Sequence, residues 1–446
     1  MSSSKDHPEI WRAANEVRVI DGHDHLAPEE KRITGPIDPL HTLFAHYAPS
    51  DLVSAGMPVQ DLVYIRKHEL PLAERWERFS PYWEKIQNTG YARTLNIAVK
   101  DLYGVNGITS DTYSELAVKM KQANKKGLYN WILREKAGID VAILDCECFG
   151  ERVDEVDKSF FAPVSRLEDF LIPRNADDIS RLSKKVGKPI HTLKELVDCF
   201  ELELERLRPH IVGLKMAHAY YRILQFDKVT FFEAERAFNR IHSQRGFNKG
   251  KAEDVYQAKK HMEQLSWEES KPLHDFMIHK MIQQGIRHGL PIQIHTGLHE
   301  GNENIISNSN PVHLVNLFLE YTDARFVIFH GSYPYTGELS VLAKNFPNVY
   351  LDMAWLHIIS PSATRRALSE WLDTVPGNKI IGFGGDFRFV EGTYGHLKIA
   401  RNNIALTLID KVQNDSYTTK EAISLVRRLL RDNALELYLP QGFNRD

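Results

Sequence analysis

Short apolar runs recur along the chain, and longer segments with helical periodicity lie between and after them. The runs are rich in β-branched or aromatic side chains and too short for helices, which is typical of strands buried on both faces of a parallel sheet. The predicted strands are Val17–Ile20, Val141–Leu144, Phe160–Val164, Ile211–Leu214, Ile292–Ile294, Phe326–Phe329, Val349–Leu351 and Ile380–Phe383. The predicted helices include Pro311–Tyr321, Gly337–Asn345, Pro361–Thr374 and Thr419–Leu435. Eight strands that alternate with helices predict an α/β protein, a (β/α)₈ TIM barrel.

Two long segments interrupt this alternation, residues 27–138 and residues 222–290. Both carry helical patterns and exceed by far the usual length of a connection between elements. We therefore predict a distorted barrel with two helical insertions, placed where they could cover the barrel mouth. No internal repeat and no Gly-, Ser- or Pro-rich linker divides the chain, so residues 1–446 are predicted to form a single domain.

The composition narrows the class of protein. The 446 residues are 43% hydrophobic and 26% charged with a net charge of −3, which excludes a disordered chain and gives no basic surplus for a nucleic-acid or anionic-membrane partner. Three cysteines cannot build a disulfide framework, which favours a reducing compartment. The N-terminus lacks the apolar core of a signal peptide, and no run approaches the about 18 apolar residues of a membrane helix. We predict a cytoplasmic protein whose partner is a small molecule.

Metal-ligand and ionisable side chains follow several of the predicted strands. The first strand runs into DGHDHL, where the alternation of an extended chain puts His23 and His25 on one face, so that both imidazoles can bind one metal. Further such residues follow later strands: Lys215 and His218 the fourth, His295 and His299 the fifth, His330 the sixth, Asp386 and Arg388 the eighth. Because the strands of a parallel barrel open their carboxyl ends on one face, these residues are predicted to converge there.

This residue set predicts a divalent metal and hydrolytic chemistry. Imidazole nitrogen and carboxylate oxygen suit Zn²⁺, our first choice, and also Mn²⁺ or Fe²⁺. A zinc site with an open position binds water and lowers its pKa to about 7, which supplies hydroxide at neutral pH. A neighbouring carboxylate can take the proton, and a nearby histidine can stabilise the oxyanion or shuttle a proton.

The ordered set of DGHDH, Lys215, His295, His330 and Asp386 resembles the amidohydrolase superfamily, in particular its amidohydrolase 2 branch of hydrolases and decarboxylases. The resemblance runs from about Val17 to the closing DNALELYLP. It implies a metal at the mouth of a distorted barrel, with four ligands: His23, His25, His295 and Asp386. It also implies that His330 is catalytic. Lys215 stands where two-metal members carry a carbamylated bridging lysine, so a second-metal role, a substrate contact and a plain ion pair all remain open for it.

A narrower resemblance points to the uronate isomerases. The segment GGDFRFVEGTYGHLKIARNNIALTLIDKV is similar to the one that follows their last strand and carries an Asp-x-Arg motif, which Asp386 and Arg388 match. The chain length and the helical insertions are similar as well. The tryptophan-rich signature expected near the seventh strand is not evident, because VYLDMAWLHII offers only Trp355 and His357.

Four side chains are candidates for substrate contact: Arg388, His299, Tyr333 and Trp355. Arg388 is the strongest because a guanidinium can clamp a substrate carboxylate through two hydrogen bonds. Ordinary packing explains the other three equally well. Cys146 and Cys148 in LDCECFG favour buried thiols over a metal site, since no further ligand accompanies them.

Together these observations predict a metal-dependent hydrolase in which Asp386 is the general base and His330 stabilises or protonates the tetrahedral intermediate. The substrate is a small polar molecule, carboxylate-bearing if Arg388 clamps it, and it is cleaved at a C–N or C–O bond. A decarboxylase or a uronate-type isomerase would use the same residues differently. A non-catalytic metal-bound scaffold would instead close the coordination shell. A homo-oligomer is compatible with each of these functions.

Overall fold

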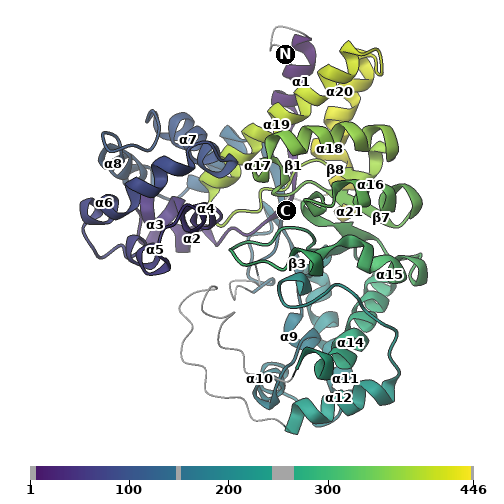
Figure 1. Cartoon of the computed structure of the whole chain (residues 1–446). Coiled ribbons are helices and arrows are strands. Elements are labelled where there is room, and N and C mark those ends of the chain that lie inside the picture. Colours follow the sequence, from purple (N-terminus) through teal and green to yellow (C-terminus); the bar gives the residue numbers. More distant parts are fainter. Residues whose placement is uncertain (1–6, 147–151, 244–265, 443–446) are drawn as a thin grey trace.

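The computed structural model describes residues 7–146, 152–243 and 266–442. Their centre is a barrel of eight parallel strands that follow one another in chain order (Figure 1). The strands are β1 (Val19–Asp24), β2 (Ile139–Leu144), β3 (Phe161–Ser165), β4 (Gly213–Met216), β5 (Ile292–Ile294), β6 (Phe326–Ile328), β7 (Val349–Asp352) and β8 (Ile380–Ile381). Each overlaps one predicted strand, and all their residues except Tyr350 are buried, which confirms the (β/α)₈ barrel and its doubly covered sheet.

Strand β1 and the segment that follows β8 bring the barrel close to closure. The backbone nitrogen of Asp386 donates to the carbonyl oxygen of His23 at 2.8 Å, and that of His25 donates to Phe387 at 3.1 Å. These bonds lie at the carboxyl ends of both strands, so the closure of the barrel itself sets Asp386 beside the two histidines.

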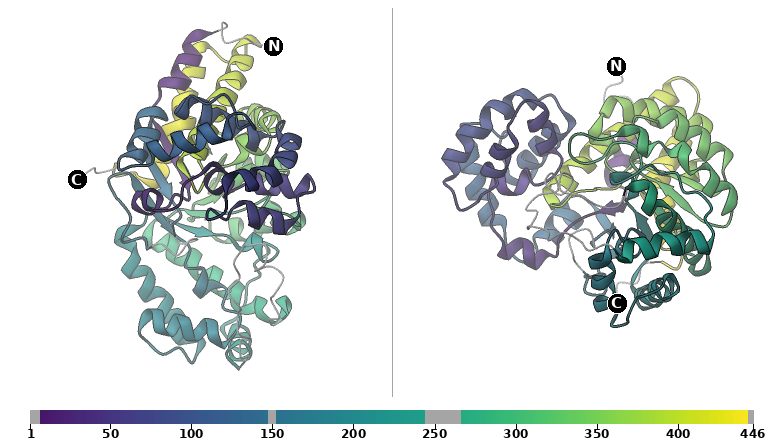
Figure 2. Two further views of the ribbon diagram at one scale, coloured as in Figure 1. Left: turned by 90° about the vertical axis from the view of Figure 1, so that its left-hand side faces the viewer. Right: turned by 60° about the horizontal axis from the view of Figure 1, so that its bottom comes forward.

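The chain between β1 and β2 forms a group of helices, which we call the first lobe (residues 29–123). Its helices are α2 (Glu29–Thr34), α3 (Pro39–Leu43), α4 (Ala48–Ser54), α5 (Val59–Ile65), α6 (Leu72–Trp83), η1 (Glu84–Ile86), α7 (Gly90–Tyr103) and α8 (Tyr113–Ala123). A π-helical turn, η2 (Asn130–Lys136), leads on to β2. The first lobe stands beside the barrel, purple to blue in Figure 2.

Helix α7 attaches the first lobe to the barrel because it packs against α19 (Val390–Gln413). The two helices approach closely at Gly395, where a Cβ would lie 2.2 Å from the carbonyl oxygen of Thr94. Such a contact excludes any larger side chain, so glycine is required at this crossing.

A second group of helices lies around β3 and β4, at the bottom of Figure 1. It contains α9 (Glu168–Leu171), α10 (Ala176–Val186), α11 (Leu193–Leu207), η4 (Arg208–His210), η5 (His218–Tyr220), α12 (Phe231–Ser243) and α14 (Trp267–His288). The predicted insertion at 222–290 falls partly here, and its residues 244–265 lie outside the described residues.

The remaining elements complete the outer ring. They are α1 (Pro8–Glu16), η6 (Ile306–Ser309), η7 (Pro311–Leu314), α15 (Val315–Glu320), η8 (Phe329–Ser332), α16 (Thr336–Asn345), α17 (Leu356–Ile359), α18 (Pro361–Thr374), η9 (Gly377–Lys379), α20 (Thr419–Arg427), η10 (Arg428–Asp432) and α21 (Asn433–Tyr438). The predicted helix Pro361–Thr374 coincides with α18, whereas the predicted Thr419–Leu435 divides into three parts because a π-helical turn interrupts it.

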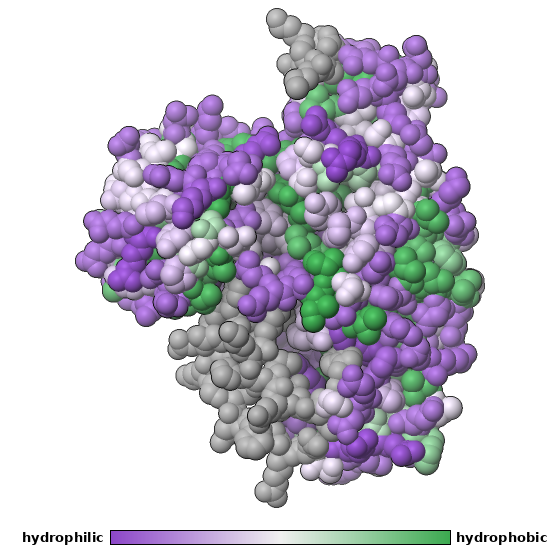
Figure 3. Space-filling view, viewed as in Figure 1, coloured by the Kyte–Doolittle hydropathy of each residue, from purple (hydrophilic) through white to green (hydrophobic). Residues whose placement is uncertain are grey.

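On the face shown in Figure 3, hydrophilic residues cover most of the surface, and hydrophobic residues form a band near the centre and a patch at the right-hand side. In the described part of the chain, no helix combines the length and the apolar character needed to cross a membrane.

Candidate metal centre and active site

Two histidines at the end of β1 and one carboxylate after β8 meet inside the barrel mouth. His25 Nε2 lies 3.1 Å from Asp386 Oδ1, and His23 Nε2 lies 3.5 Å from the same oxygen. All three side chains are at least nine-tenths buried. The structure therefore brings together three of the four ligands that the sequence predicts.

The position of the hydrogen on His25 indicates which kind of ion this cluster can bind. Its Nδ1 lies 3.0 Å from the carbonyl oxygen of Asp145, which can only accept, so Nδ1 carries the hydrogen. A neutral His25 then presents a lone pair at Nε2, and this lone pair faces the carboxylate of Asp386. Two electron-rich atoms 3.1 Å apart repel each other unless a proton or a metal ion lies between them. Imidazole nitrogen with carboxylate oxygen is a donor set of divalent transition metals, so the residues present fit such an ion.

Asp145, at the end of β2, is a second carboxylate near the histidines. His23, His25 and Asp145 each present one ligand atom within 4.8 Å of the others. Asp386 is nevertheless the closer carboxylate, because Asp145 Oδ2 lies 3.9 Å from His25 Nδ1. Burial raises the pKa of Asp145, but the charge of Arg166 outweighs burial and lowers that pKa overall. Asp145 is thus an ionised group that orients His25 through its carbonyl oxygen.

The turn that carries Asp386 is held from both sides by β1. Asp386 itself has a left-handed backbone with φ of 55°. The nitrogen of Gly385 donates to Asp21 Oδ1 and that of Phe387 donates to Asp24 Oδ1, each at 2.8 Å. The peptides on either side of Asp386 are therefore fixed by buried carboxyl groups of the strand that carries the histidines, which sets the direction of the Asp386 side chain.

The electrostatics favour an ionised acid beside neutral histidines. Burial works to raise the pKa of Asp386, but its interactions with His25, His330 and His23 outweigh burial and hold this pKa well below its usual range. Burial, followed by the charge of Lys215, lowers the pKa of His23 well below its usual range. Neutral imidazole and ionised carboxylate are the forms that bind metals.

His330, after β6, lies on the other side of Asp386. Its Nδ1 is 2.9 Å from the carbonyl oxygen of Ala354 and 3.5 Å from Asp386 Oδ2. Its Nε2 is 2.8 Å from Nδ1 of His295, whose Nε2 lies 3.0 Å from the carbonyl oxygen of Leu298. Among the described residues, the side-chain hydrogen bonds of His295 thus run to His330 and Leu298. The predicted fourth ligand lies next to the predicted catalytic histidine, not against Asp386.

Lys215 occupies the barrel interior behind the histidines. Its Nζ lies 3.5 Å from His23 Nε2 and 3.7 Å from the centre of the Phe329 ring. Burial lowers the pKa of Lys215 to about 8. The lysine is therefore a neighbour of a proposed ligand and, being buried, is no surface residue.

The first lobe contributes a tyrosine that the sequence analysis missed. The Tyr47 ring stacks on Trp355 with ring centres 4.4 Å apart, and Tyr91 stacks on Tyr47 at 5.4 Å. Burial raises the pKa of Tyr47 well above its usual range, and the charge of Asp386 and a hydrogen bond between the two side chains add to this effect. Trp355, a predicted substrate contact, is thus part of an aromatic stack at the site. No sequence signal marked Tyr47, because it lies within an insertion and not at a strand end.

A charged group lies further out in the mouth. Glu300 Oε2 is 3.3 Å from His46 Nε2 and 3.4 Å from Arg388 Nη2. Burial works to raise the pKa of Glu300, but His46 and then Arg388 lower it to about 2. The predicted contact Arg388 therefore stands at the mouth, paired with an acid that the sequence analysis did not single out.

The two remaining predicted substrate contacts lie in the β5 and β6 connections. His299 is buried and stacks on Tyr220 with ring centres 4.8 Å apart, and Tyr220 also lies 4.6 Å from the His295 ring. Tyr333 is half-buried, packs against the hydrophobic core and accepts a backbone hydrogen bond from Leu298. The first thus lies near the site, and the second supports the loop that carries His295.

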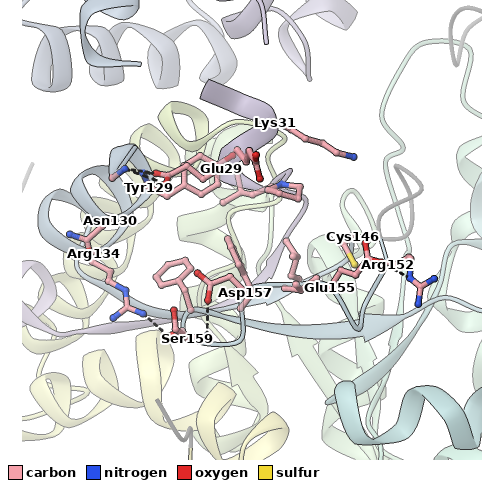
Figure 4. Close-up of a pocket in the computed structure, with 18 of the residues that line it drawn as sticks. Glu29, Lys31, Tyr129, Asn130, Arg134, Cys146, Arg152, Glu155, Asp157 and Ser159 are labelled. Atoms are coloured by element: carbon pink, nitrogen blue, oxygen red, sulfur yellow. Dashed lines mark hydrogen bonds and ion pairs between the residues drawn. The ribbon is translucent and has the colours of Figure 1, made fainter. Parts of the chain in front are cut away.

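A cavity of about 880 Å³ lies beside the candidate metal centre, between α2, η2 and the connection from β2 to β3 (Figure 4). Leu26 and Cys146, which directly follow His25 and Asp145, are among its lining residues. The predicted metal ligands do not line it. Cys146 is buried, as the sequence suggested, whereas Cys148 lies outside the described residues.

Comparison with known proteins agrees with this geometry. Residues 266–439 match the amidohydrolase family model. This segment contains β5 to β8 and carries His295, His330 and Asp386. The match confirms the resemblance to amidohydrolases, and it points to an enzyme with a small-molecule substrate.

Among curated proteins, the chain is 29% identical over 239 residues to Protein fluG of Emericella nidulans, which covers 52% of this chain. The chain spans only about a quarter of that relative, 26% of its length.

Solved structures share the fold over almost the whole chain. A uronate isomerase of Thermotoga maritima is 14% identical with a TM-score of 0.76, covering 97% of both chains. A glucuronate isomerase of Caulobacter crescentus is 17% identical with a TM-score of 0.73, covering 97% of this chain and 93% of its own. A Lactobacillus casei protein assigned as a metal-dependent hydrolase is 18% identical with a TM-score of 0.64, covering 97% and 98%. At these identities the likeness shows the fold.

Proposed function

We propose that the protein is a metal-dependent hydrolase that cleaves a C–N or C–O bond in a small polar substrate. The observation that carries this proposal is the meeting of His23 Nε2 and His25 Nε2 on one oxygen of Asp386, at 3.5 and 3.1 Å. The amidohydrolase match supports the same class. The proposed cofactor is one divalent ion, Zn²⁺ first, with Mn²⁺ or Fe²⁺ as alternatives.

His23, His25 and Asp386 would hold this ion. A divalent metal in such a site polarises the scissile carbonyl and lowers the pKa of water, which supplies a nucleophile at neutral pH. His295, which the resemblance implies as a fourth ligand, would have to exchange its contact with His330 or Leu298 for the metal.

The protein residues divide the proton transfers. Asp386 is ionised and acts as the general base through Oδ2, which faces His330 Nδ1 at 3.5 Å. His330 stabilises the oxyanion or protonates the tetrahedral intermediate, with His295 hydrogen-bonded behind it. Lys215 adds positive charge behind His23, which favours a developing anion. Arg388, His299, Tyr333 and Trp355 remain our proposed substrate contacts.

We further propose that residues 1–446 act as one domain with insertions at 27–138 and 222–290. Tyr47 supports this, because a residue of the first insertion hydrogen-bonds the proposed base, Asp386.

One observation favours a second candidate, a sugar-acid isomerase. The hydrogen bond between Tyr47 and Asp386 makes an acid–base pair, and such a pair can move a proton between neighbouring carbons of one substrate. The uronate isomerase of Thermotoga maritima, with its similar fold, is consistent with this alternative.

Metal removal tests the proposed function. The protein is stripped with a chelator, its metal content is measured, and Zn²⁺, Mn²⁺ or Fe²⁺ is restored before assay on amides, esters and lactones in ¹⁸O-labelled water. We expect activity to require metal and each turnover to place one labelled oxygen in the product. Activity that persists without metal contradicts the proposal, and aldose–ketose conversion of a uronate without label uptake favours the isomerase.

A further inference from the structure

Opposite charges stand side by side at the mouth of the proposed site. Arg388 lies two residues after Asp386, and its Nη2 is 3.4 Å from Glu300 Oε2 in the loop after β5. Both side chains keep about a quarter of their surface exposed, 27% for Arg388 and 25% for Glu300. The pair is therefore partly accessible to solvent and to a ligand.

The ion pair of Arg388 and Glu300 has a longer contact than the ion pair of Arg166 and Asp145 near the proposed metal ligands. Arg166 Nε donates to Asp145 Oδ1 at 3.0 Å and to Oδ2 at 2.8 Å, and its Nη2 lies 2.8 Å from Oδ2. The shortest approach of Arg388 to Glu300 is 3.4 Å. A long, partly exposed contact holds its partners weakly, so a ligand can separate or bridge them at low cost.

Glu300 also keeps one oxygen available. The contacts from His46 and Arg388 both fall on Oε2. Within the described residues, no hydrogen bond ends on Oε1 of Glu300. An ionised carboxylate oxygen in a partly exposed mouth is a strong acceptor for an ammonium group.

We infer that Glu300 and Arg388 together bind a zwitterionic group of the substrate, with an ammonium on Glu300 and a carboxylate on Arg388. The inference rests on the proposed function, because it takes the space between this pair and Asp386 as the substrate site. The substrate class is then an amino acid derivative whose reacting bond lies at the other end of a short chain.

The arrangement of charges discriminates against substrates that carry only a carboxylate or only an ammonium group. A substrate with only a carboxylate would meet Arg388 beside a negative oxygen, and one with only an ammonium would meet Glu300 beside a guanidinium. Each would have to accept a like charge close to its own, which is a repulsive element of specificity. A zwitterion satisfies both groups at once.

The distances require a small molecule. His46 contacts Glu300 through Nε2, and its ring centre lies 6.5 Å from that of His25. One imidazole thus separates the ion pair from a proposed metal ligand. A chain of a few bonds between the zwitterion and the reacting group spans this gap.

Binding of three matched probes to the Zn²⁺-loaded full chain tests the inference by calorimetry. L-homoserine carries both charges, 4-hydroxybutanoate carries only the carboxylate, and 3-aminopropan-1-ol carries only the ammonium. None has an amide, ester or lactone bond, so the assay measures binding without turnover. We expect L-homoserine to bind at least ten-fold more tightly than either of the others.

Glu300→Gln should weaken the binding of L-homoserine at least ten-fold and leave the binding of 4-hydroxybutanoate unchanged or tighter. Glu300→Asp keeps the charge and should therefore retain part of the preference for L-homoserine. Arg388→Gln should weaken the binding of the two probes that carry a carboxylate, L-homoserine and 4-hydroxybutanoate, and leave the binding of 3-aminopropan-1-ol unchanged. Glu303→Gln, an exposed residue of the same loop, is the control and should change nothing.

Three results would each overturn the inference. They are equal binding of L-homoserine and 4-hydroxybutanoate, an equal loss of affinity for all probes in Glu300→Gln, and no binding of L-homoserine. Its failure is separable from that of the proposed function. Hydrolysis confined to substrates without an ammonium would refute the zwitterion site alone. Preferential L-homoserine binding without hydrolysis of any amide, ester or lactone would refute the hydrolase alone.

Discussion

At the scale of single residues, the proposed site is marked by an unusual backbone conformation. Asp386, His330, Tyr47 and Trp355 all have a positive backbone φ, of 55°, 61°, 57° and 65°. For residues other than glycine this costs about 1–3 kcal/mol each, and it persists only where the surroundings enforce it. The concentration of such residues around one carboxylate is independent support for a functional site.

Asp386→Asn tests the metal centre with little effect on the fold, because asparagine tolerates a left-handed backbone. Loss of the charge that His23 and His25 face should lower metal affinity by at least about 100-fold. Metal content after dialysis and the turnover number are the measurements. Asp415→Asn is the matched control, since Asp415 is exposed and has a φ of 57°. Retention of wild-type metal affinity in Asp386→Asn contradicts the ligand assignment.

Tyr47→Phe separates proton transfer from packing. The ring and its stack on Trp355 remain, but the hydrogen bond to Asp386 is lost. If Tyr47 takes part in proton transfer, kcat should fall about 100-fold with metal content unchanged. Tyr91→Phe, in the same stack, should change kcat by less than about three-fold because its hydroxyl is not on Asp386. An equal effect of both substitutions would assign Tyr47 to packing.

At the scale of elements, a buried acid ties the first lobe to the barrel. Glu391, in the first turn of α19, is fully buried. Its Oε1 accepts from Arg32 Nη2 of α2 and from the Tyr103 hydroxyl of α7, both at 2.6 Å. Because Tyr47 belongs to the same lobe, this anchor affects the site as well as the fold.

Arg32→Met should destabilise the protein by about 3–5 kcal/mol, because it leaves the Glu391 carboxylate buried without its positive partner. Chemical denaturation measures the change in the free energy of unfolding. Arg78→Met is the control, since Arg78 pairs with Asp61 while half-exposed and should contribute at most about 1 kcal/mol. A loss as small as that of the control would show that the anchor does not stabilise the lobe.

At the scale of the whole molecule, the barrel and its inner site residues could be predicted from the sequence, whereas the outer residues could not. Buried strands appear in the sequence as apolar runs. The geometry of a parallel barrel then brings His23 and Asp386 together, although they lie far apart in the sequence. His46, Tyr47 and Glu300 lie in an insertion and in a loop, where no periodicity fixes the direction of a side chain. Their positions depend on tertiary packing, which a single sequence does not encode locally.

The many buried histidines make a final prediction about the whole fold. Burial lowers the pKa of His274 and of His357 to about 3 in each case, against about 6.5 in an unfolded chain. Between pH 6.5 and 3 the unfolded state therefore binds more protons than the folded state, and the free energy of unfolding falls as the pH falls. Each histidine contributes a slope of up to about 1.4 kcal/mol per pH unit, so acid should unfold the protein well above pH 3.

His357→Gln isolates one of these contributions. His357 Nε2 lies 2.8 Å from the carbonyl oxygen of Gly382, and a glutamine amide can donate to the same oxygen without titrating. Urea unfolding from pH 7 to 4.5 should show a pH slope smaller by up to about 1.4 kcal/mol per unit than in the wild type. His68→Gln, at a half-exposed residue, is the control variant. If both variants keep the wild-type slope, the buried His357 is not a source of acid lability, and the loss of stability has to come from other buried groups.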